Sequence, residues 1–310
     1  MNMLILVLLL LIPYCNIAQG SWSLGNPMPK PKSEMASAII GDKIYVPAGI
    51  NFWGSLNSFY AYDISDNSWE ELPPLPKKVN HIGMAAHDGK LYISCGFKDL
   101  FQTKTLTTFW MYDPSTKVYT AKANLPYKRA AHSMITIGNK IYLVGGSGEA
   151  TDKILVYTPA TDTWDEGLKP FPEPQRDHIN LLYKDKKLYV VAGRTKKGAQ
   201  KACWYYNFKT KEWVNFATLN LPSGGQAAAI LGDEIHIVGG EDLPTNKCFA
   251  RHDIYNLSTQ QWTQGTPLQK TRHGMVSEVH QGKWYVIGGA YKANWGTVTT
   301  LSDWIEIYTP

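Results

Sequence analysis

Arginine and histidine side chains recur at one place along this sequence, shortly before an apolar segment of strand character. Guanidinium groups bind carboxylates, sulfates and phosphates through paired hydrogen bonds, and imidazoles exchange protons near neutral pH. Gathered at one opening, such groups would bind an anionic ligand and move a proton on it. The arginines are Arg129, Arg176 and Arg272, and the histidines are His81, His132, His178 and His273.

Further polar and aromatic residues stand just after the same apolar segments. Arg194 and Glu241 add charge, whereas Trp53, Tyr291 and Trp295 offer flat faces of the kind on which sugar rings stack. If the chain brings both sets of loops to one end of the molecule, these residues line the same concave site.

Motifs for several other chemistries are missing from the sequence. It has no CxxC, no HExxH and no paired metal-ligand spacing, so we predict neither a metal site nor a cofactor. It also has no G-x-S-x-G motif, and the Ser223-Gly224-Gly225 turn lacks the strand-to-helix context of a nucleophile elbow. Glycoside hydrolysis by paired carboxylates is not supported either.

Composition favours a folded protein built from short strands. Hydrophobic residues make up 44% of the 310 residues and charged residues only 18%, which allows a large core. The 11 Trp, 18 Tyr, 26 Gly and 18 Pro are typical of strands joined by tight turns. A net charge of +5 without a basic run argues against a nucleic-acid partner.

The first 20 residues differ from the rest. Leu4 to Ile12 is an apolar run of nine residues, followed by Pro13 and the small-x-small pattern Ala18-Gln19-Gly20. This pattern predicts a signal peptide over residues 1–20 and an exported protein, periplasmic or secreted. The alternative is a buried core segment. No later segment is long and apolar enough for a membrane span.

Three cysteines follow the predicted signal peptide, so at most one disulfide forms. Cys95 lies in an apolar strand pattern and is expected to be a small buried residue. Whether Cys203 and Cys248 pair stays open.

A repeat of about 48 residues explains the remaining chain. Each copy has a strand ending in a glycine pair or its variant, and the second residues of these pairs lie 47, 50, 47, 47 and 49 positions apart. A tyrosine landmark follows each pair, and in five copies an aromatic stands seven residues later. The second residues of the pairs are Gly49, Gly96, Gly146, Gly193, Gly240 and Gly289.

The sixth copy lacks its last strand, because the sequence ends at Pro310. The missing piece stands at the other end, where residues 22–29 read like residues 69–76. We therefore expect the segment after the signal peptide to supply the outer strand of the last sheet and close a ring. The predicted fold is all-β, a six-bladed β-propeller over residues 21–310.

These features resemble the kelch repeat family, in particular its secreted bacterial members. The resemblance rests on the glycine-pair strand, the Tyr112-Asp113-Pro114 turn, the spaced tryptophan and an arginine before several inner strands. It implies a propeller whose Arg and His loops meet at one mouth of the axial channel, and repeat tryptophans that pack between blades. Kelch propellers include partner-binding modules, sugar-acid isomerases and lyases, and copper oxidases, so the resemblance is specific for fold and not for activity.

Three functions from different classes remain. The first is β-elimination from a uronate by an exported, monomeric enzyme that binds an anionic carbohydrate. The second, similar to kelch sialic-acid mutarotases, interconverts anomers. The third is a non-catalytic glycan- or protein-binding propeller.

Elimination needs a cation on the carboxylate, a base and an acid. We assign the catalytic roles to Arg176, His178, His273 and Tyr291. The expected substrate-binding residues are Arg129, Arg272, Arg194, His81, His132, Trp53, Trp295 and Glu241.

Overall fold

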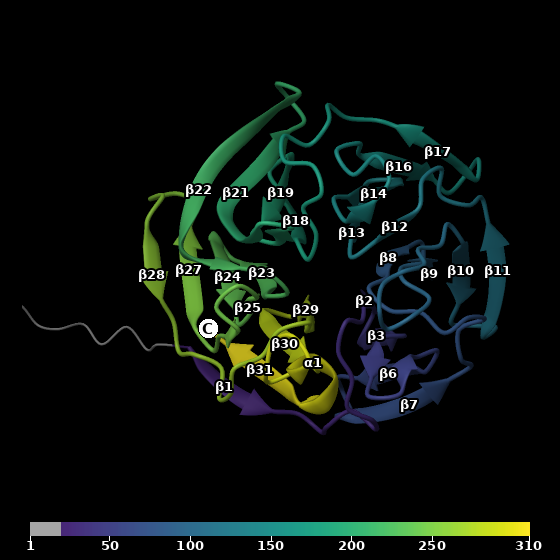
Figure 1. The fold of residues 1–310 in the computed structure, drawn as a ribbon, viewed down its shortest axis with the longest axis horizontal. Coiled ribbons are helices and arrows are strands. Elements are labelled where there is room, and N and C mark those ends of the chain that lie inside the picture. The colour runs from purple at the N-terminus through teal and green to yellow at the C-terminus, as the bar shows by residue number, and fades with distance from the viewer. Residues whose placement is uncertain (1–19) are drawn as a thin grey trace, which may run out of the picture.

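Each copy of the repeat forms one antiparallel sheet of four main strands, and the six sheets stand radially around an axis (Figure 1). The computed structural model describes residues 20–310. The first three blades contain β2 (Ala38–Ile40), β3 (Lys43–Pro47), β6 (Phe59–Asp63) and β7 (Ser68–Leu72); β8 (Gly83–His87), β9 (Lys90–Ser94), β10 (Phe109–Asp113) and β11 (Val118–Lys122); β13 (Ser133–Ile137), β14 (Lys140–Val144), β16 (Leu155–Thr158) and β17 (Thr163–Glu166).

The other three blades follow the same order from the axis outward. They contain β18 (Asn180–Lys184), β19 (Lys187–Val191), β21 (Gly198–Asn207) and β22 (Glu212–Ser223); β23 (Ala227–Leu231), β24 (Glu234–Val238), β27 (His252–Asn256) and β28 (Trp262–Gln264); β29 (Val276–His280), β30 (Lys283–Ile287), β31 (Ile305–Thr309) and β1 (Ser21–Leu24). The predicted six-bladed propeller is confirmed.

The first strand closes the ring, as the incomplete sixth copy predicted. β1 pairs antiparallel with β31, with Trp22 opposite Tyr308, so the two ends of the described chain share the last blade. Figure 1 shows β1 lying beside β31 at the outside of this blade. Closure leaves no blade without its outer strand, which removes an exposed edge that would otherwise pair with other chains.

Aromatic residues of the outer strands join neighbouring blades. In five blades, one aromatic of the outer strand donates a hydrogen bond of 2.8–2.9 Å to a carbonyl that follows the outer strand of the preceding blade. The predicted role of the repeat tryptophans between blades therefore holds for Trp69, Trp164 and Trp213, and Trp22 takes the same place in the last blade. The donors and acceptors are Trp22 to Thr266, Trp69 to Asn26, Tyr119 to Pro73, Trp164 to Ala123 and Trp213 to Lys169.

The hydrophobic core lies between neighbouring blades. The middle strands are almost fully buried, because both of their faces are covered by the adjacent sheets. Phe59 of β6 and Tyr112 of β10, for example, meet edge to face across the first two blades with ring centroids 5.0 Å apart. Stacking of this kind fixes the angle between blades and hence the geometry at the axis.

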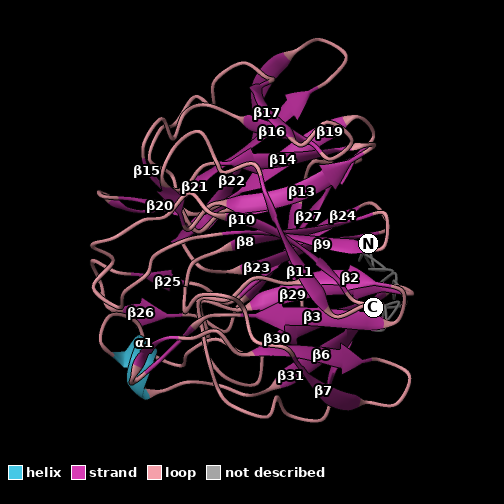
Figure 2. Ribbon diagram, turned by 90° about the vertical axis from the view of Figure 1, so that its right-hand side faces the viewer, coloured by secondary structure: helices cyan, strands magenta, loops and turns pink. Residues whose placement is uncertain are grey.

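The loops that connect the second and third strands of the blades gather at one end of the propeller. They carry short strands and one helical turn, and Figure 2 shows β15, β20, β25, β26 and α1 on the same side, opposite the C-terminus. We call this end the loop face. Its short elements are β4 (Ile50–Asn51), β5 (Gly54–Ser55), β12 (Arg129–Ala130), β15 (Ser147–Gly148), β20 (Arg194–Thr195), β25 (Glu241–Asp242), β26 (Lys247–Cys248) and α1 (Gly296–Thr299).

Three further sequence predictions concern the signal peptide, the cysteines and membrane-spanning segments. The predicted signal peptide lies outside the described residues except for Gly20, so it stays a prediction. Within residues 20–310, Cys95, Cys203 and Cys248 are free, and the pairing of the last two that the sequence left open is not formed. No helix of this part of the chain is both long and apolar enough to cross a membrane.

Candidate functional site

A ring of backbone hydrogen bonds encircles the propeller axis. One residue of each blade takes part, and its N–H donates to the carbonyl of the equivalent residue in the preceding blade, over 2.8–3.4 Å. We call this set the axial ring. Because its bonds are made by the main chain, the ring fixes where each side chain starts. Its members are Glu34, His81, Ala131, His178, Gly225 and Gly274.

All members of the axial ring have left-handed backbone conformations, with φ between 52° and 66°. Such angles cost about 1 kcal/mol or more for residues other than glycine, yet glutamate and two histidines adopt them here. Gly274 is required for a second reason, since a Cβ at this position would lie 2.6 Å from the Glu34 carboxylate. These strained backbone conformations place the side chains of Glu34, His81 and His178 at the axis.

These three side chains meet one another. Glu34 Oε2 lies 3.3 Å from His81 Nε2 and 3.2 Å from His178 Nε2. Each of the three side chains is at most 7% exposed. Residues 47 and 144 positions apart from Glu34 in the chain are thus brought into contact by the closed ring.

A neighbouring side chain holds each of the two imidazoles in place. Nδ1 of His81 lies 2.5 Å from Asn80 Oδ1, and Nδ1 of His178 lies 2.6 Å from Asp177 Oδ1. Both oxygens are acceptors, so the Nδ1 atoms are the protonated, donating nitrogens. The Nε2 atoms are therefore the ones that face Glu34.

Arg194 connects this group to a second carboxylate. Its Nε donates to Asp177 over 3.1 Å, its Nη1 pairs with Glu241, and its Nη2 lies 3.2 Å from His178 Nε2. His273, only 1% exposed, places Nδ1 3.4 Å from Glu241 Oε2 and 3.8 Å from Glu34. We call the whole set the mouth cluster; it comprises Glu34, His81, Asp177, His178, Arg194, Glu241 and His273.

The protonation of the mouth cluster is set by burial and by its internal charges. Burial lowers the pKa of His81 to about 4, although Glu34 opposes this shift. Burial and Arg194 also lower the pKa of His178, but the carboxylates of Asp177 and Glu34 outweigh them and raise it to about 9. Burial raises the pKa of Glu34, yet the histidines around it bring the pKa well below its usual value.

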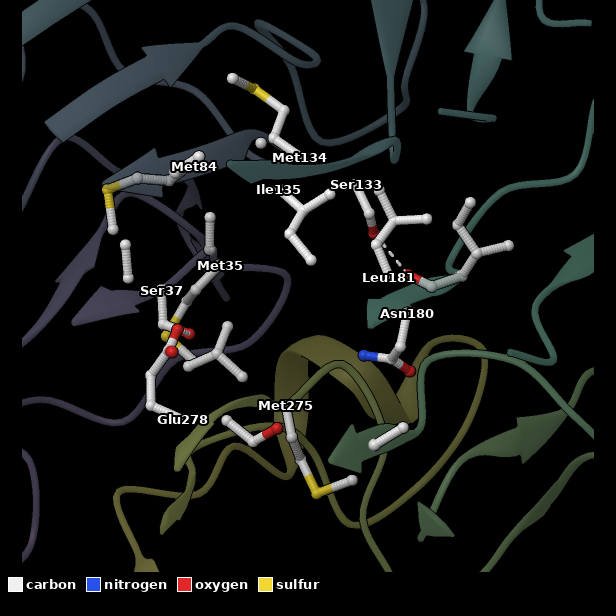
Figure 3. A pocket seen from close by; sticks show the side chains of 18 of the residues that line it. Met35, Ser37, Met84, Ser133, Met134, Ile135, Asn180, Leu181, Met275 and Glu278 are labelled. Atoms are coloured by element: carbon white, nitrogen blue, oxygen red, sulfur yellow. Dashed lines mark hydrogen bonds between the residues drawn. The ribbon is translucent and has the colours of Figure 1, made fainter. Parts of the chain in front are cut away.

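Two cavities meet at the axial ring, and Glu34 and His81 line both. One, of about 380 Å³, opens on the loop face. The other, of about 510 Å³, runs along the inner strands (Figure 3). The cavity on the loop face has a polar floor and an apolar wall. The floor is formed by five members of the mouth cluster, Glu34, His81, Arg194, Glu241 and His273, and the wall by Ile50, Leu100, Phe101, Leu243, Trp295 and Val298.

Large aromatic side chains stand exposed at the loop-face opening. Phe101 and Trp295 are 73% and 71% exposed, and their rings meet edge to face at 6.5 Å. We call this pair the aromatic rim. Phe52 and Trp53, in the loop between β4 and β5, form a second exposed pair with centroids 5.2 Å apart. Exposed aromatics beside a concave pocket are a common mark of a binding surface.

The structure does not bring Arg129, Arg176 and Arg272 together, and the predicted anion clamp is wrong in this respect. Each of them is fully buried, and among residues 20–310 none lines either cavity. Arg129 donates to the carbonyls of Gly145, Glu149 and Ala150 in its own blade. These arginines stand two residues before the axial ring and satisfy loop carbonyls that burial would leave unpaired.

The two other arginines bind within their blades in the same way. Arg176 pairs with Glu173 and donates to the carbonyl of Ala202. Arg272 donates to the carbonyls of Gly288 and Trp304 and pairs with Glu306. The roles in ligand binding and catalysis that we predicted for them would require an accessible guanidinium group, which none of them has.

Three further predicted residues lie away from the mouth cluster. His132 follows the axial ring by one residue, and its Nε2 bonds Ser94 Oγ at 2.6 Å. The Tyr291 hydroxyl donates to Ser302, and the residue lines neither cavity of the described chain. Trp53 is 89% exposed and contacts Phe52 rather than the mouth cluster. The structure does bring together His81, His178, Arg194, Glu241 and His273, and Trp295 lines the same cavity as four of them. The roles in binding and catalysis that the sequence suggested for these residues stay predictions.

Sequence reasoning missed three residues of the site. Asn80 and Asp177 stand directly before the histidines that they hold, and this adjacency was the available signal. Phe101 lies in a loop of variable length after the second glycine pair, and no repeat pattern marks it.

The inner cavity contains a carboxyl group, that of Glu278, with an unusually high pKa. Figure 3 shows Glu278 of β29 beside Ser37, whose hydroxyl donates to it over 2.7 Å. Burial raises the pKa of Glu278 to about 7, and the bond from Ser37 offsets only part of this. The folded protein therefore holds this proton more tightly than the unfolded chain does.

This acidity predicts a pH-dependent effect of Glu278→Gln on stability. The stabilising contribution of the raised pKa is present below the unfolded value and is lost as pH rises towards 7. We expect the variant to match the wild type at about pH 4, below the ordinary pKa of a glutamate, and to be more stable by about 1–2 kcal/mol at pH 8. A shift of one pKa unit corresponds to about 1.4 kcal/mol, and the expected gain is smaller than the full shift implies because the cavity admits water. Urea unfolding at both pH values measures this. The same gain in Glu71→Gln, an exposed residue of β7, or a gain equal at both pH values, would contradict it.

Fold and site together define a kelch-type propeller with a polar cluster at one mouth of its channel. Comparison with known proteins agrees with this. The family model of the KLHDC2/KLHL20/DRC7 Kelch-repeats domain matches residues 14–146 and 131–305. The chain belongs to this kelch-repeat family.

Individual relatives carry kelch names as well. Kelch-like protein 23 of Homo sapiens is 25% identical over 208 residues, which cover 65% of this chain and 37% of that protein. Kelch-like protein terF of Aspergillus terreus is 28% identical over 328 residues, covering 94% of this chain and 68% of that protein. The chain thus spans little more than a third of the length of the human relative.

A solved structure shows the same fold. The chain described as the structure of YjhT superposes with a TM-score of 0.78 and 17% identity, over 92% of this chain and 96% of that one. At this identity the likeness concerns the propeller alone.

Proposed function

We propose that this chain is a binding propeller that holds a protein partner at the loop-face cavity. The observation that carries the proposal is the aromatic rim, Phe101 and Trp295, standing exposed above a cavity of about 380 Å³ with apolar walls and a polar floor. A loop of a partner with one apolar or aromatic anchor residue fits this shape. Buried aromatic anchors supply most of the binding energy in many protein interfaces.

The charges on the floor of the loop-face cavity favour a protein partner over an anionic sugar. Two of the three cationic nitrogens of Arg194 are occupied by the carboxylates of Asp177 and Glu241. The three other predicted cations are buried in the blades. A uronate carboxylate entering the cavity would therefore meet Glu34 and Glu241 with no free guanidinium group from that set.

Elimination from a uronate stays a second proposal, supported by the meeting of His81, His178 and Arg194. It would use a histidine as base, and its product, with a new carbon–carbon double bond conjugated to a carboxylate, would absorb at about 230 nm. The sialate-anomer reaction would use the same groups. Neither proposal accounts for the exposed aromatic rim as directly as a protein partner does.

A peptide-display selection against the full chain, run beside a glycan array that includes uronate oligosaccharides, tests the proposal. We expect selected peptides to share an apolar anchor, and Phe101→Ala with Trp295→Ala to weaken their binding by at least about tenfold, since each anchor contact is worth more than about 1 kcal/mol.

The control is Tyr183→Ala, which removes an aromatic that is 41% exposed near the turn between β18 and β19. It should bind the peptides like the wild type. Peptides that bind the rim variant undiminished would overturn the proposal. Glycan binding without peptide binding, or a rise in absorbance with uronates, would favour the alternatives.

A further inference from the structure

The mouth cluster contains a conflict between hydrogen-bond acceptors. Because Nδ1 of His81 and of His178 donates to a neighbouring side chain, each neutral ring turns the lone pair of Nε2 towards the Glu34 carboxylate. Lone pairs facing a carboxylate at 3.2–3.3 Å repel it unless a positive species lies between them. Arg194 Nη2 meets the Nε2 atom of His178 at 3.2 Å. Among the described residues Nε2 of His81 has only the Glu34 contact, so a proton or a cation is needed between Glu34 and His81.

A second observation points the same way. Nε2 of His273 lies 3.1 Å from the Lys292 carbonyl, to which it donates, so its Nδ1 is the bare nitrogen. Among the described residues this Nδ1 and Glu241 Oε2 are buried without a hydrogen-bond partner, 3.4 Å apart. Both residues are 1% exposed and belong to the same cluster. A second imidazole–carboxylate contact thus also lacks the positive group it needs.

We propose that Glu34, His81 and His178 bind a divalent transition-metal ion of the zinc type at the axis, with Glu241 and His273 next to it. The ligand atoms of the first three lie within 4.8 Å of one another. Tetrahedral zinc with bonds of about 2.0–2.1 Å separates its ligand atoms by about 3.3–3.4 Å. The separations of 3.2 and 3.3 Å between the carboxylate oxygen and the two Nε2 atoms match this edge.

The surroundings of the ligands have the form that metal sites require. Zinc-binding histidines usually donate their second nitrogen to a carboxylate or carbonyl oxygen, which fixes the tautomer and the ring. Asp177 and Asn80 provide these acceptors at 2.6 and 2.5 Å. Two imidazoles and one carboxylate also leave a fourth position for a water or a partner's donor atom, and Glu34 and His81 line both cavities that meet at the axis.

Charge balance favours a divalent ion over a monovalent one. Metal binding requires neutral imidazoles, so the ion would replace the proton that His178 holds. In that state the mouth cluster carries the negative charges of Glu34, Asp177 and Glu241 and the positive charge of Arg194. The buried sum is −2, and burial of uncompensated charge is costly. A divalent cation neutralises it, and Arg194 gives up only its contact to His178 Nε2 while keeping both carboxylates.

The test is titration of the chelator-treated full chain with Zn²⁺ and Co²⁺, by calorimetry and by the visible d–d bands of Co²⁺. We expect one ion per chain and a tetrahedral Co²⁺ spectrum. Glu34→Gln and His178→Gln should each weaken binding by at least about 100-fold, and the positioning variant Asp177→Asn by about 10–100-fold. His280→Gln is the matched control and should bind like the wild type, because His280 of β29 is partly buried outside the mouth cluster, beside Asp42.

Several results would overturn the proposal. They are absence of stoichiometric binding to the wild type, a Co²⁺ spectrum typical of the hydrated ion, or unchanged affinity in Glu34→Gln and His178→Gln. Thermal melting checks that each variant folds; if the ligand variants do not, Asp177→Asn and the wild-type spectrum decide. The rim variant Phe101→Ala with Trp295→Ala should bind the metal normally, so failure of the proposed function and failure of the metal site are distinguishable.

Discussion

Replacing Arg272 by alanine is expected to destabilise the propeller by about 3–5 kcal/mol, the range for breaking one side of a buried ion pair. Arg272 and Glu306 are both 0% exposed, and the pair joins the loop before β29 to β31. The guanidinium also satisfies the carbonyls of Gly288 and Trp304. Its removal would leave a buried carboxylate and two buried carbonyls without this partner.

Chemical unfolding of the variant measures this loss, and Lys283→Ala at an exposed position of β30 is the control. The double variant Arg272→Leu with Glu306→Leu should recover much of the stability, because apolar pairs of similar volume replace buried ion pairs at small cost. A loss below 1 kcal/mol for Arg272→Ala, together with lost binding at the mouth, would contradict the structural role and restore the ligand-binding role.

Replacing Trp22 by alanine is expected to cost about 2–3 kcal/mol, somewhat below the range for a fully buried tryptophan because its ring is only partly covered. The indole of Trp22 packs against Trp284, Tyr308 and His252 with centroids 5.0–5.9 Å apart. It also donates to the Thr266 carbonyl over 2.8 Å, which joins the last blade to the fifth. The variant weakens ring closure and not just one strand.

Leu24→Ala is the matched control on the same strand, since Leu24 is 53% exposed. We expect it to change the free energy of unfolding by less than about 0.5 kcal/mol. If the two substitutions had equal effects, the packing of Trp22 would make no specific contribution to closing the ring. A Trp22→Ala variant as stable as the wild type would have the same meaning.

The ring could be predicted from the sequence because each repeat marks its own position. The glycine pairs take left-handed φ values that side chains disfavour, as at Gly146 and Gly240, so their spacing counts the blades. The segment around Trp22 repeats the segment around Trp69, and this identified the closing strand. Because these backbone requirements recur at a regular spacing, a single sequence is enough to detect them.

The direction of individual side chains could not be read in the same way. Arg176 and His178 are two residues apart, yet one is buried within its blade and the other belongs to the axial ring. His132 and His178 differ by one position relative to the ring, which sends His132 towards Ser94. Alignment on the glycine pairs has an uncertainty of about one residue, and one residue decides between the core and the mouth.

The pairing of Glu34 with histidines of two other blades was equally hidden. Nothing local in the sequence relates Glu34 to His81 or His178, because their contact arises from closure of the ring. The small residues Ala131, Gly225 and Gly274 at the other ring positions leave room for it. Which side chains meet at the axis can be stated only once the backbone hydrogen bonds between blades are known.

The central claim is that ring closure gathers residues of separate blades into one site at the loop-face mouth. Anomalous diffraction from crystals of the full chain grown with Zn²⁺ tests it most directly. We predict a single strong peak on the propeller axis, between Glu34 Oε2 and the Nε2 atoms of His81 and His178. A peak elsewhere on the chain, or electron density in which these three side chains point away from one another, would contradict the account.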